Sequence, residues 1–115
     1  MSAVKIQVLQ DVAIVAFVET KIVDSQRIEM IGSELQGAIP QAIHKKMLLD
    51  FDGVAFMSSA MLTKLVLLHK ACKTKGIDLK LCSITPNVME VFKITKLNKL
   101  FDIQSTLEKA LKSFS

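Results

Sequence analysis

Residues 47–62 read MLLDFDGVAFMSSAML and join a short apolar run to the start of a long amphipathic segment. The run Met47–Phe51 is interrupted only by Asp50, which is typical of a strand buried on both faces. Beyond it, from Ser58 to Lys75, apolar side chains recur at helical spacing, and a glycine follows. We therefore predict a buried strand, a loop, and a long helix with Ser58 as its N-cap.

The residues before this strand predict a hairpin and a helix. Runs rich in Val and Ile at 5–9 and 12–18, joined by residues 10–11, are typical of a β-hairpin with a tight polar turn. After Asp24 the apolar residues recur at steps of three and four. This spacing predicts an amphipathic helix that Asp24 or Ser25 caps and that a proline ends.

The residues after the long helix continue the alternation of strands and helices. The predicted elements are a strand at 77–82, a short helix capped by Thr85 with Pro86 behind it, an edge strand at 101–103 and a helix that begins at Ser105. Strands joined through helices imply parallel pairing by right-handed crossovers. We therefore expect an α/β fold, a mixed sheet of about four to five strands with an N-terminal hairpin and about four helices packed on it.

The length and composition fit one globular domain. The chain has 115 residues, of which 50% are hydrophobic, so we expect a single domain over residues 1–115. No run approaches the roughly 20 apolar residues of a membrane span, and residues 1–10 lack the order of a secretory signal. We expect a cytoplasmic protein without a membrane partner. Cys72 and Cys82 match no zinc or redox spacing, and we predict that both are buried thiols.

The charge balance is compatible with an anionic partner, but we do not expect direct nucleic-acid binding. Fifteen Lys and Arg against eleven Asp and Glu give a net charge of +4. Arg27 is the only arginine, and Tyr and Trp are absent from the sequence. Recognition of bases and phosphates depends largely on arginine and stacking aromatic residues. A lysine-rich surface that binds a nucleotide or an anionic lipid stays an alternative.

No group of side chains has the spacing of a catalytic, metal or cofactor site. His44 lies in a polar loop and His69 near the edge of the apolar arc of the long helix, and neither has a triad or metal-ligand partner at the usual spacing. Asp50 and Asp52 suit magnesium as paired carboxylates, but turn formation explains them better. We therefore predict that the chain is not an enzyme and needs no cofactor or metal.

Two adjacent hydroxyl groups, on Ser58 and Ser59, mark the start of the long helix. N–H groups at a helix start lack internal partners, and the helix dipole makes this end positive, so a phosphate there is electrostatically tolerated. It adds roughly −2 charge and disrupts an apolar contact at that surface. Capping alone also accounts for both serines. Leu67, between Thr63 and Thr74 on the polar side of the helix, is a candidate anchor for a protein contact.

Four motifs follow one another along the chain: residues 47–62, Lys70-Ala-Cys-Lys-Thr-Lys-Gly76, Leu79-Lys-Leu-Cys-Ser-Ile-Thr-Pro86, and the segment from Val88 to Ile103. In order and spacing they resemble the STAS domain, whose soluble bacterial members are anti-sigma factor antagonists. The similarity runs from about Met47 to Leu111, and the preceding hairpin and helix agree with the STAS fold.

The resemblance implies that Ser59 is the phosphoacceptor, because the phosphorylated serine of the family falls on it; Ser58 is the second choice. In the family, a kinase-like anti-sigma factor, an ATP-binding serine kinase, phosphorylates this serine. The unphosphorylated antagonist binds that partner and frees the sigma factor. A phosphatase is a further expected partner. This sequence has Ser58 where the family usually has Asp, and Met61 where it usually has Gly.

The resemblance also implies where the partner binds. In the sheet order of the family, Asp24, Ser25, Asp52, Ser58 and Ser59 share one rim, and the long helix adds Thr63 and Leu67. We therefore expect an anti-sigma factor antagonist that acts by partner switching, as a monomer or weak homodimer. A STAS scaffold that is not phosphorylated, or a regulatory module that binds a ligand, stays open as an alternative.

Overall fold

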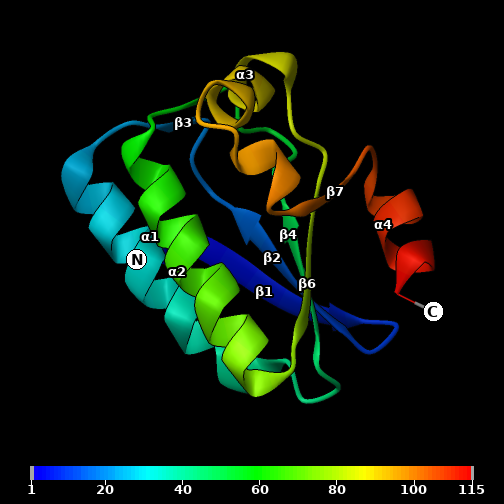
Figure 1. Cartoon of the computed structure of the whole chain (residues 1–115). Helices are drawn as coiled ribbons and strands as arrows, with labels where there is room; N and C mark the ends of the chain where they lie inside the picture. The colour runs from blue at the N-terminus through cyan, green and yellow to red at the C-terminus, as the bar shows by residue number, and fades with distance from the viewer. Residues whose placement is uncertain (1, 115) are drawn as a thin grey trace.

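The computed structural model describes residues 2–114 and contains a five-stranded mixed sheet with four α-helices (Figure 1). In the order β1-β2-β4-β6-β7, β1 and β2 are antiparallel and the other neighbours are parallel. The strands are β1 (Val4–Leu9), β2 (Val12–Phe17), β4 (Lys46–Asp50), β6 (Asp78–Cys82) and β7 (Asp102–Gln104). The helices are α1 (Ser25–Ala38), α2 (Ala60–Lys75), α3 (Pro86–Ile94) and α4 (Leu107–Ser113), with short 3-10 turns η1 (Ile39–Gln41) and η2 (Leu97–Lys99). The predicted fold class is confirmed.

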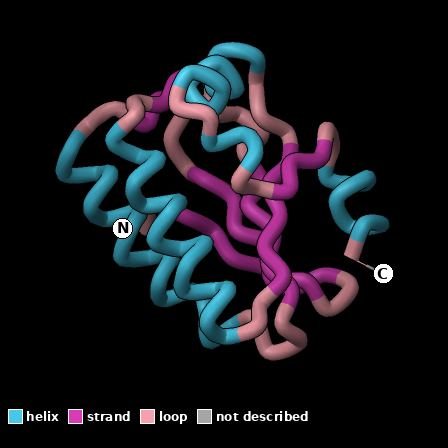
Figure 2. Tube along the Cα trace, viewed as in Figure 1, coloured by secondary structure: helices cyan, strands magenta, loops and turns pink. Residues whose placement is uncertain are grey.

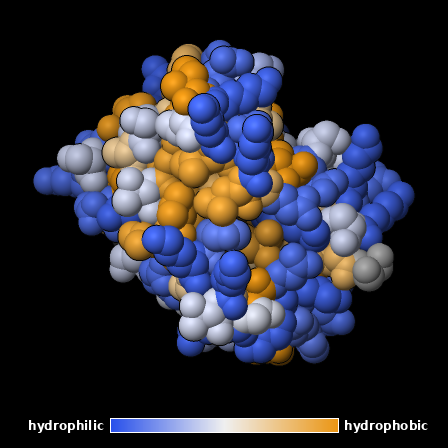
Figure 3. Space-filling view, viewed as in Figure 1, coloured by the Kyte–Doolittle hydropathy of each residue, from blue (hydrophilic) through white to orange (hydrophobic). Residues whose placement is uncertain are grey.

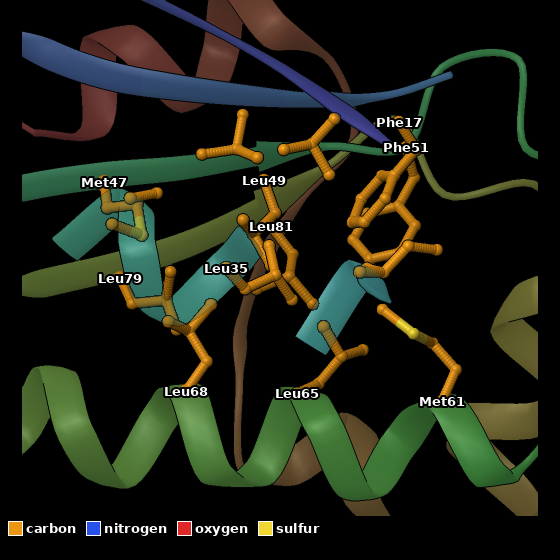
Figure 4. Packing of buried hydrophobic residues seen from close by; sticks show 14 of the residues in the cluster. Phe17, Leu35, Met47, Leu49, Phe51, Met61, Leu65, Leu68, Leu79 and Leu81 are labelled. Atoms are coloured by element: carbon orange, nitrogen blue, oxygen red, sulfur yellow. The ribbon is translucent and has the colours of Figure 1, made fainter. Parts of the chain in front are cut away.

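Helices α1 and α2 lie side by side on one face of the sheet and enclose the main core (Figure 1). Met61, Leu65 and Leu68 project from α2 toward the sheet (Figure 4), and none of these side chains is exposed to solvent. The helical arc predicted for this segment is thus confirmed. Among residues 2–114, no helix is long and apolar enough to cross a membrane.

The hairpin and the first helix cap follow directly from local residue chemistry. Gln10 and Asp11 adopt φ of 53° and 67°, the left-handed geometry that lets a two-residue turn match the twist of β1 and β2. The Asp24 carboxylate accepts hydrogen bonds from the N–H groups of Gln26 (2.8 Å) and Arg27 (3.1 Å), so Asp24 is the N-cap of α1. Both predicted features are confirmed.

In the segment that joins β4 to α2, two details of the structure differ from the prediction. The N-cap of α2 is Ser59 rather than Ser58; it already has helical angles (φ −63°, ψ −23°), and its side chain makes no capping hydrogen bond. A capping side chain acts from extended angles, which explains this difference. In addition, β3 (Lys21–Ile22) and β5 (Phe56–Met57) form a separate parallel pair. Strands of two residues are too short to show a periodicity in the sequence.

Helix α4 covers part of the opposite face of the sheet and encloses a second, smaller core with β2, β4 and β6 (Figures 1 and 2). It begins at Leu107, and the Thr106 hydroxyl accepts a hydrogen bond from the Lys109 N–H at 3.1 Å. The predicted start at Ser105 is therefore one residue too early for the cap. A lysine, Lys80, lies on the same face and is only 6% exposed.

The buried ammonium of Lys80 has partners on three sides. It donates a hydrogen bond to the Asp102 carboxylate, lies 3.9 Å from Asp78 Oδ2, and lies 5.3 Å from the centre of the Phe114 ring. The Lys80 hydrogen bond lowers the pKa of the Asp102 carboxyl below its ordinary value of 3.8. Since an unpaired buried charge is costly, the Lys80–Asp102 pair contributes to stability while Asp102 is ionised.

We expect Asp102→Ala to lower the free energy of unfolding at pH 7 by about 2 kcal/mol, less than the roughly 3–5 kcal/mol for breaking a fully buried pair, because Asp102 is half-exposed. The matched change Asp78→Ala, at the longer distance, should cost under about 0.5 kcal/mol. Because the pKa of Asp102 is lowered in the folded state, its stabilising effect is present above about pH 4 and is lost as the pH falls through the folded pKa. Urea unfolding at pH 7 and pH 3 tests this. If the difference in the free energy of unfolding between wild type and Asp102→Ala is the same at both pH values, the prediction is contradicted.

Candidate partner-binding site

The loop before α2 is held by the short strand pair. The Ser58 N–H donates to the Ile22 carbonyl at 2.9 Å, which ties the loop to β3. The Ser58 and Ser59 carbonyls then accept the N–H groups of Met61 (3.1 Å) and Leu62 (3.0 Å) and start the helix. Ser58 is half-buried and Ser59 is exposed. The two hydroxyl groups therefore differ in accessibility although they are adjacent in sequence.

A hollow of about 370 Å³, which we call the Ser59 hollow, lies between α2 and the segment that joins α3 to η2. Its apolar lining consists of Leu62, Val66, Leu67 and Leu97. Its polar lining consists of Ser59, Thr63, Lys70 and Thr95. Figure 3 shows apolar side chains gathered between α2 and η2 on this face. The hollow thus combines an apolar interior, three hydroxyl groups and one ammonium group, with no carboxylate in its lining.

A second hollow, which we call the Ser58 hollow, lies on the other side of the start of α2, against α1, with a volume of about 290 Å³. Ser25, Ser58 and Thr63 contribute hydroxyl groups to it. Its charged residues, Glu29 and Lys64, form an ion pair with 2.6 Å between Oε2 and Nζ. The two adjacent serines therefore belong to two hollows of different charge.

The structure brings together most of the predicted partner-binding residues. Ser25, Ser58 and Thr63 line the Ser58 hollow, while Ser59, Thr63 and Leu67 line the Ser59 hollow, so Thr63 belongs to both. Asp24 immediately precedes Ser25 as the cap of α1. Leu67 is 49% exposed.

Asp52 lies in neither hollow. It belongs to the turn after β4, where its N–H donates to Asp50 Oδ1 at 3.0 Å and Gly53 adopts a φ of 88°. The carboxylate of Asp50 thus stabilises the turn by accepting this hydrogen bond. This is what we expect if Asp50 and Asp52 form a turn.

The Ser59 hollow is completed by five residues that are not among the predicted site residues: Leu62, Val66, Lys70, Thr95 and Leu97. Thr95 and Leu97 lie far along the chain from Ser59, and their placement depends on the docking of α3. The Thr95 hydroxyl bonds to the carbonyls of Val91 (2.9 Å) and Phe92 (3.1 Å) and fixes the end of α3. No local pattern marks Thr95 and Leu97, because only tertiary packing brings them to α2.

The two thiols are buried in the core, as predicted. Cys72 and Cys82 are free and buried, and burial raises the pKa of each thiol to about 11. At that pKa the reactive thiolate is scarce near neutral pH. Within residues 2–114, no three His, Cys, Asp or Glu side chains are grouped so that they could hold a metal ion.

The mixed sheet opens with a hairpin, two helices lie on one of its faces, and a serine loop precedes the longest helix. Together these features define a small α/β domain of the STAS type. The chain belongs to the STAS domain family, whose model matches residues 3–110. The resemblance proposed from the sequence is confirmed.

Several proteins are similar to this chain in sequence or fold. A protein of Bordetella bronchiseptica that is named as an anti-sigma factor antagonist, BtrV, is 28% identical over 93 residues, which cover 81% of this chain and 79% of BtrV. An anti-sigma-factor antagonist (STAS) domain protein of Planctomyces limnophilus has a TM-score of 0.87 at 25% identity, over 100% of this chain and 99% of that one. The Bacillus cell fate determinant SpoIIAA in its phosphorylated form has a TM-score of 0.70 at 18% identity, over 98% and 100% of the two chains, and shows the likeness of fold alone.

Proposed function

We propose that the chain is an anti-sigma factor antagonist, a non-enzymatic module that docks on a kinase-like anti-sigma factor through the Ser59 hollow and is released when Ser59 is phosphorylated. The position of Ser59 carries the proposal: its hydroxyl is exposed, makes no capping hydrogen bond, and lies at an apolar hollow. The relatives named as anti-sigma factor antagonists support the class of partner.

The surroundings of the two serines favour Ser59 over Ser58 as phosphoacceptor. Ser58 is half-buried, and the ammonium group of its hollow, that of Lys64, is already paired with the Glu29 carboxylate. The Ser59 hollow has no carboxylate in its lining. The positive N-terminal end of α2 adds a favourable field at Ser59. A dianion is therefore better tolerated by the folded chain at Ser59.

The same dianion is incompatible with a docked partner. Phosphorylation adds roughly −2 charge and three strongly hydrated oxygens at an apolar surface. A partner that covers the Ser59 hollow must remove water from these oxygens, and the apolar lining offers nothing in exchange. The contact is switched off without any change in the fold, and a phosphatase that removes the group restores it.

Phosphorylation by the anti-sigma factor is the direct test. After incubation of the chain with its anti-sigma factor and ATP, we expect peptide mass spectrometry to place one phosphate on Ser59. Ser58→Ala should be phosphorylated to the same extent, because Ser58 lies in the other hollow, whereas Ser59→Ala should not be phosphorylated. A phosphate found on Ser58 alone, or on neither serine, contradicts the proposal.

A further inference from the structure

The positive charge of the chain is concentrated in the two segments that form the Ser59 hollow. Residues 53–77, which include α2, and residues 91–101, which include the end of α3 and η2, together hold seven lysines. All eleven Asp and Glu residues lie outside these segments. The remainder of the chain has more acidic than basic residues, so the net charge of +4 comes from the two segments.

Lys70 lies on α2 well beyond Ser59, toward one end of the hollow. Ser59 and Lys70 are eleven residues apart on α2, which is about 16 Å along a helix axis. Lys64, between them in sequence, faces α1 and is paired with Glu29. The Ser59 hollow therefore has a hydroxyl end at the start of α2 and a cationic end at Lys70, with the apolar lining between them.

We propose that the Ser59 hollow receives an apolar side chain from an acidic protein surface, whose carboxylates lie over Lys70. This inference rests on the proposed function and specifies the chemistry of the partner. An apolar hollow with a charged rim is the arrangement of an interface anchor. The charge of the rim selects a partner of opposite sign and speeds the encounter. The orientation also follows, because the partner's carboxylates must lie at the end away from Ser59.

The observations favour a protein over a membrane or a nucleic acid. The apolar lining forms a hollow between two elements, which suits one inserted side chain, whereas membrane binding needs apolar side chains that project from a continuous face. Neither segment contains an arginine, the residue on which phosphate and base recognition most depends. The only arginine, Arg27, lies on α1 and is paired with Glu19.

Two capped tetrapeptides test the chemistry of the hollow without the partner. Glu-Leu-Leu-Glu and Lys-Leu-Leu-Lys share their apolar centre and differ in charge, and each is titrated into the 15N-labelled chain. We expect the acidic peptide to bind about three to five times more tightly and to shift the amide signals of Leu67, Lys70 and Leu97 most. Lys70→Glu should abolish the preference, and Lys109→Glu, on α4, should preserve it. Equal affinities, a preference for the basic peptide, or shifts away from the hollow overturn the inference.

The anti-sigma factor that phosphorylates the chain provides the second arm. Lys70→Glu should weaken its binding about tenfold relative to Lys109→Glu, and the difference should shrink at high salt. Equal effects of the two variants overturn the inference. Stronger binding to vesicles of phosphatidylcholine and phosphatidylglycerol, or to duplex DNA, than to the anti-sigma factor also overturns it. If Ser59 is never phosphorylated, the proposed switch fails while the peptide result still decides the charge preference of the hollow.

Discussion

Ser59→Asp is expected to lower the affinity of the chain for its anti-sigma factor by about 30-fold or more, since a buried charge without a partner costs an interface about 2–5 kcal/mol. The carboxylate stands at the hydroxyl end of the Ser59 hollow, where the lining offers no side-chain cation nearby, because Lys70 lies at the other end. Isothermal titration with the purified anti-sigma factor measures the effect.

The controls separate charge from shape. The side chain introduced by Ser59→Asn is nearly the same size as that of Ser59→Asp but has no charge. We expect the affinity of Ser59→Asn for the anti-sigma factor to be within about fivefold of wild type. The free energy of unfolding should change by no more than about 1 kcal/mol in Ser59→Asp, because an acidic residue is favourable at the start of a helix. If both variants lose affinity equally, the loss comes from the shape of the new side chain and not from its charge. If Ser59→Asp binds as tightly as wild type, the proposed phosphorylation switch is contradicted.

The parts of the fold that the sequence predicts well are those that local chemistry determines. The hairpin depends on two polar residues that accept left-handed angles, and α1 depends on the carboxylate of Asp24 and on apolar residues at helical spacing. Gly76, with a φ of 73°, ends α2 where the pattern predicts. In each case the signal lies within a few residues of the feature that it specifies.

The errors arise where backbone partners come from elsewhere. Ser58 has the composition of a helix cap, but its N–H is engaged by Ile22 of β3, and the helix starts one residue later. The β3–β5 pair that makes this contact consists of two residues per strand and has no period to detect. Local preference was overridden by a tertiary hydrogen bond.

The candidate site divides in the same way. Ser59, Thr63 and Leu67 can be found from the sequence because they lie on or beside one helix and share its periodicity. The opposite wall, formed by Thr95 and Leu97, cannot be found from the sequence, because its distance from Ser59 is set by how α3 and η2 pack. The charge preference of the site is an intermediate case: Lys70 is visible in the sequence, but the hollow that it lines is not.

Phe92→Ala is expected to be the most damaging single substitution considered, with a loss of about 3–5 kcal/mol in the free energy of unfolding. The Phe92 side chain is fully buried, and its ring lies edge-on to Phe51 and Phe101, with centroids 6.3 Å and 5.9 Å away. Truncation leaves a cavity among these rings. Because domains of this size are stable by about 5–15 kcal/mol, the loss is a large part of the total.

The consequence of Phe92→Ala reaches the Ser59 hollow. The Phe92 ring packs α3 against the core, and the Phe92 carbonyl accepts a hydrogen bond from the hydroxyl of Thr95. Thr95 in turn lines the hollow with Leu97. Chemical unfolding followed by circular dichroism measures the stability; Phe92→Leu, which keeps most of the volume, should cost about 1.5 kcal/mol or less. Ile94→Ala is the matched exposed control on the same helix, since Ile94 is 78% exposed, and should cost under about 0.5 kcal/mol. If Phe92→Ala costs no more than Ile94→Ala, the aromatic cluster does not hold α3, and the wall of the hollow must be positioned by other contacts.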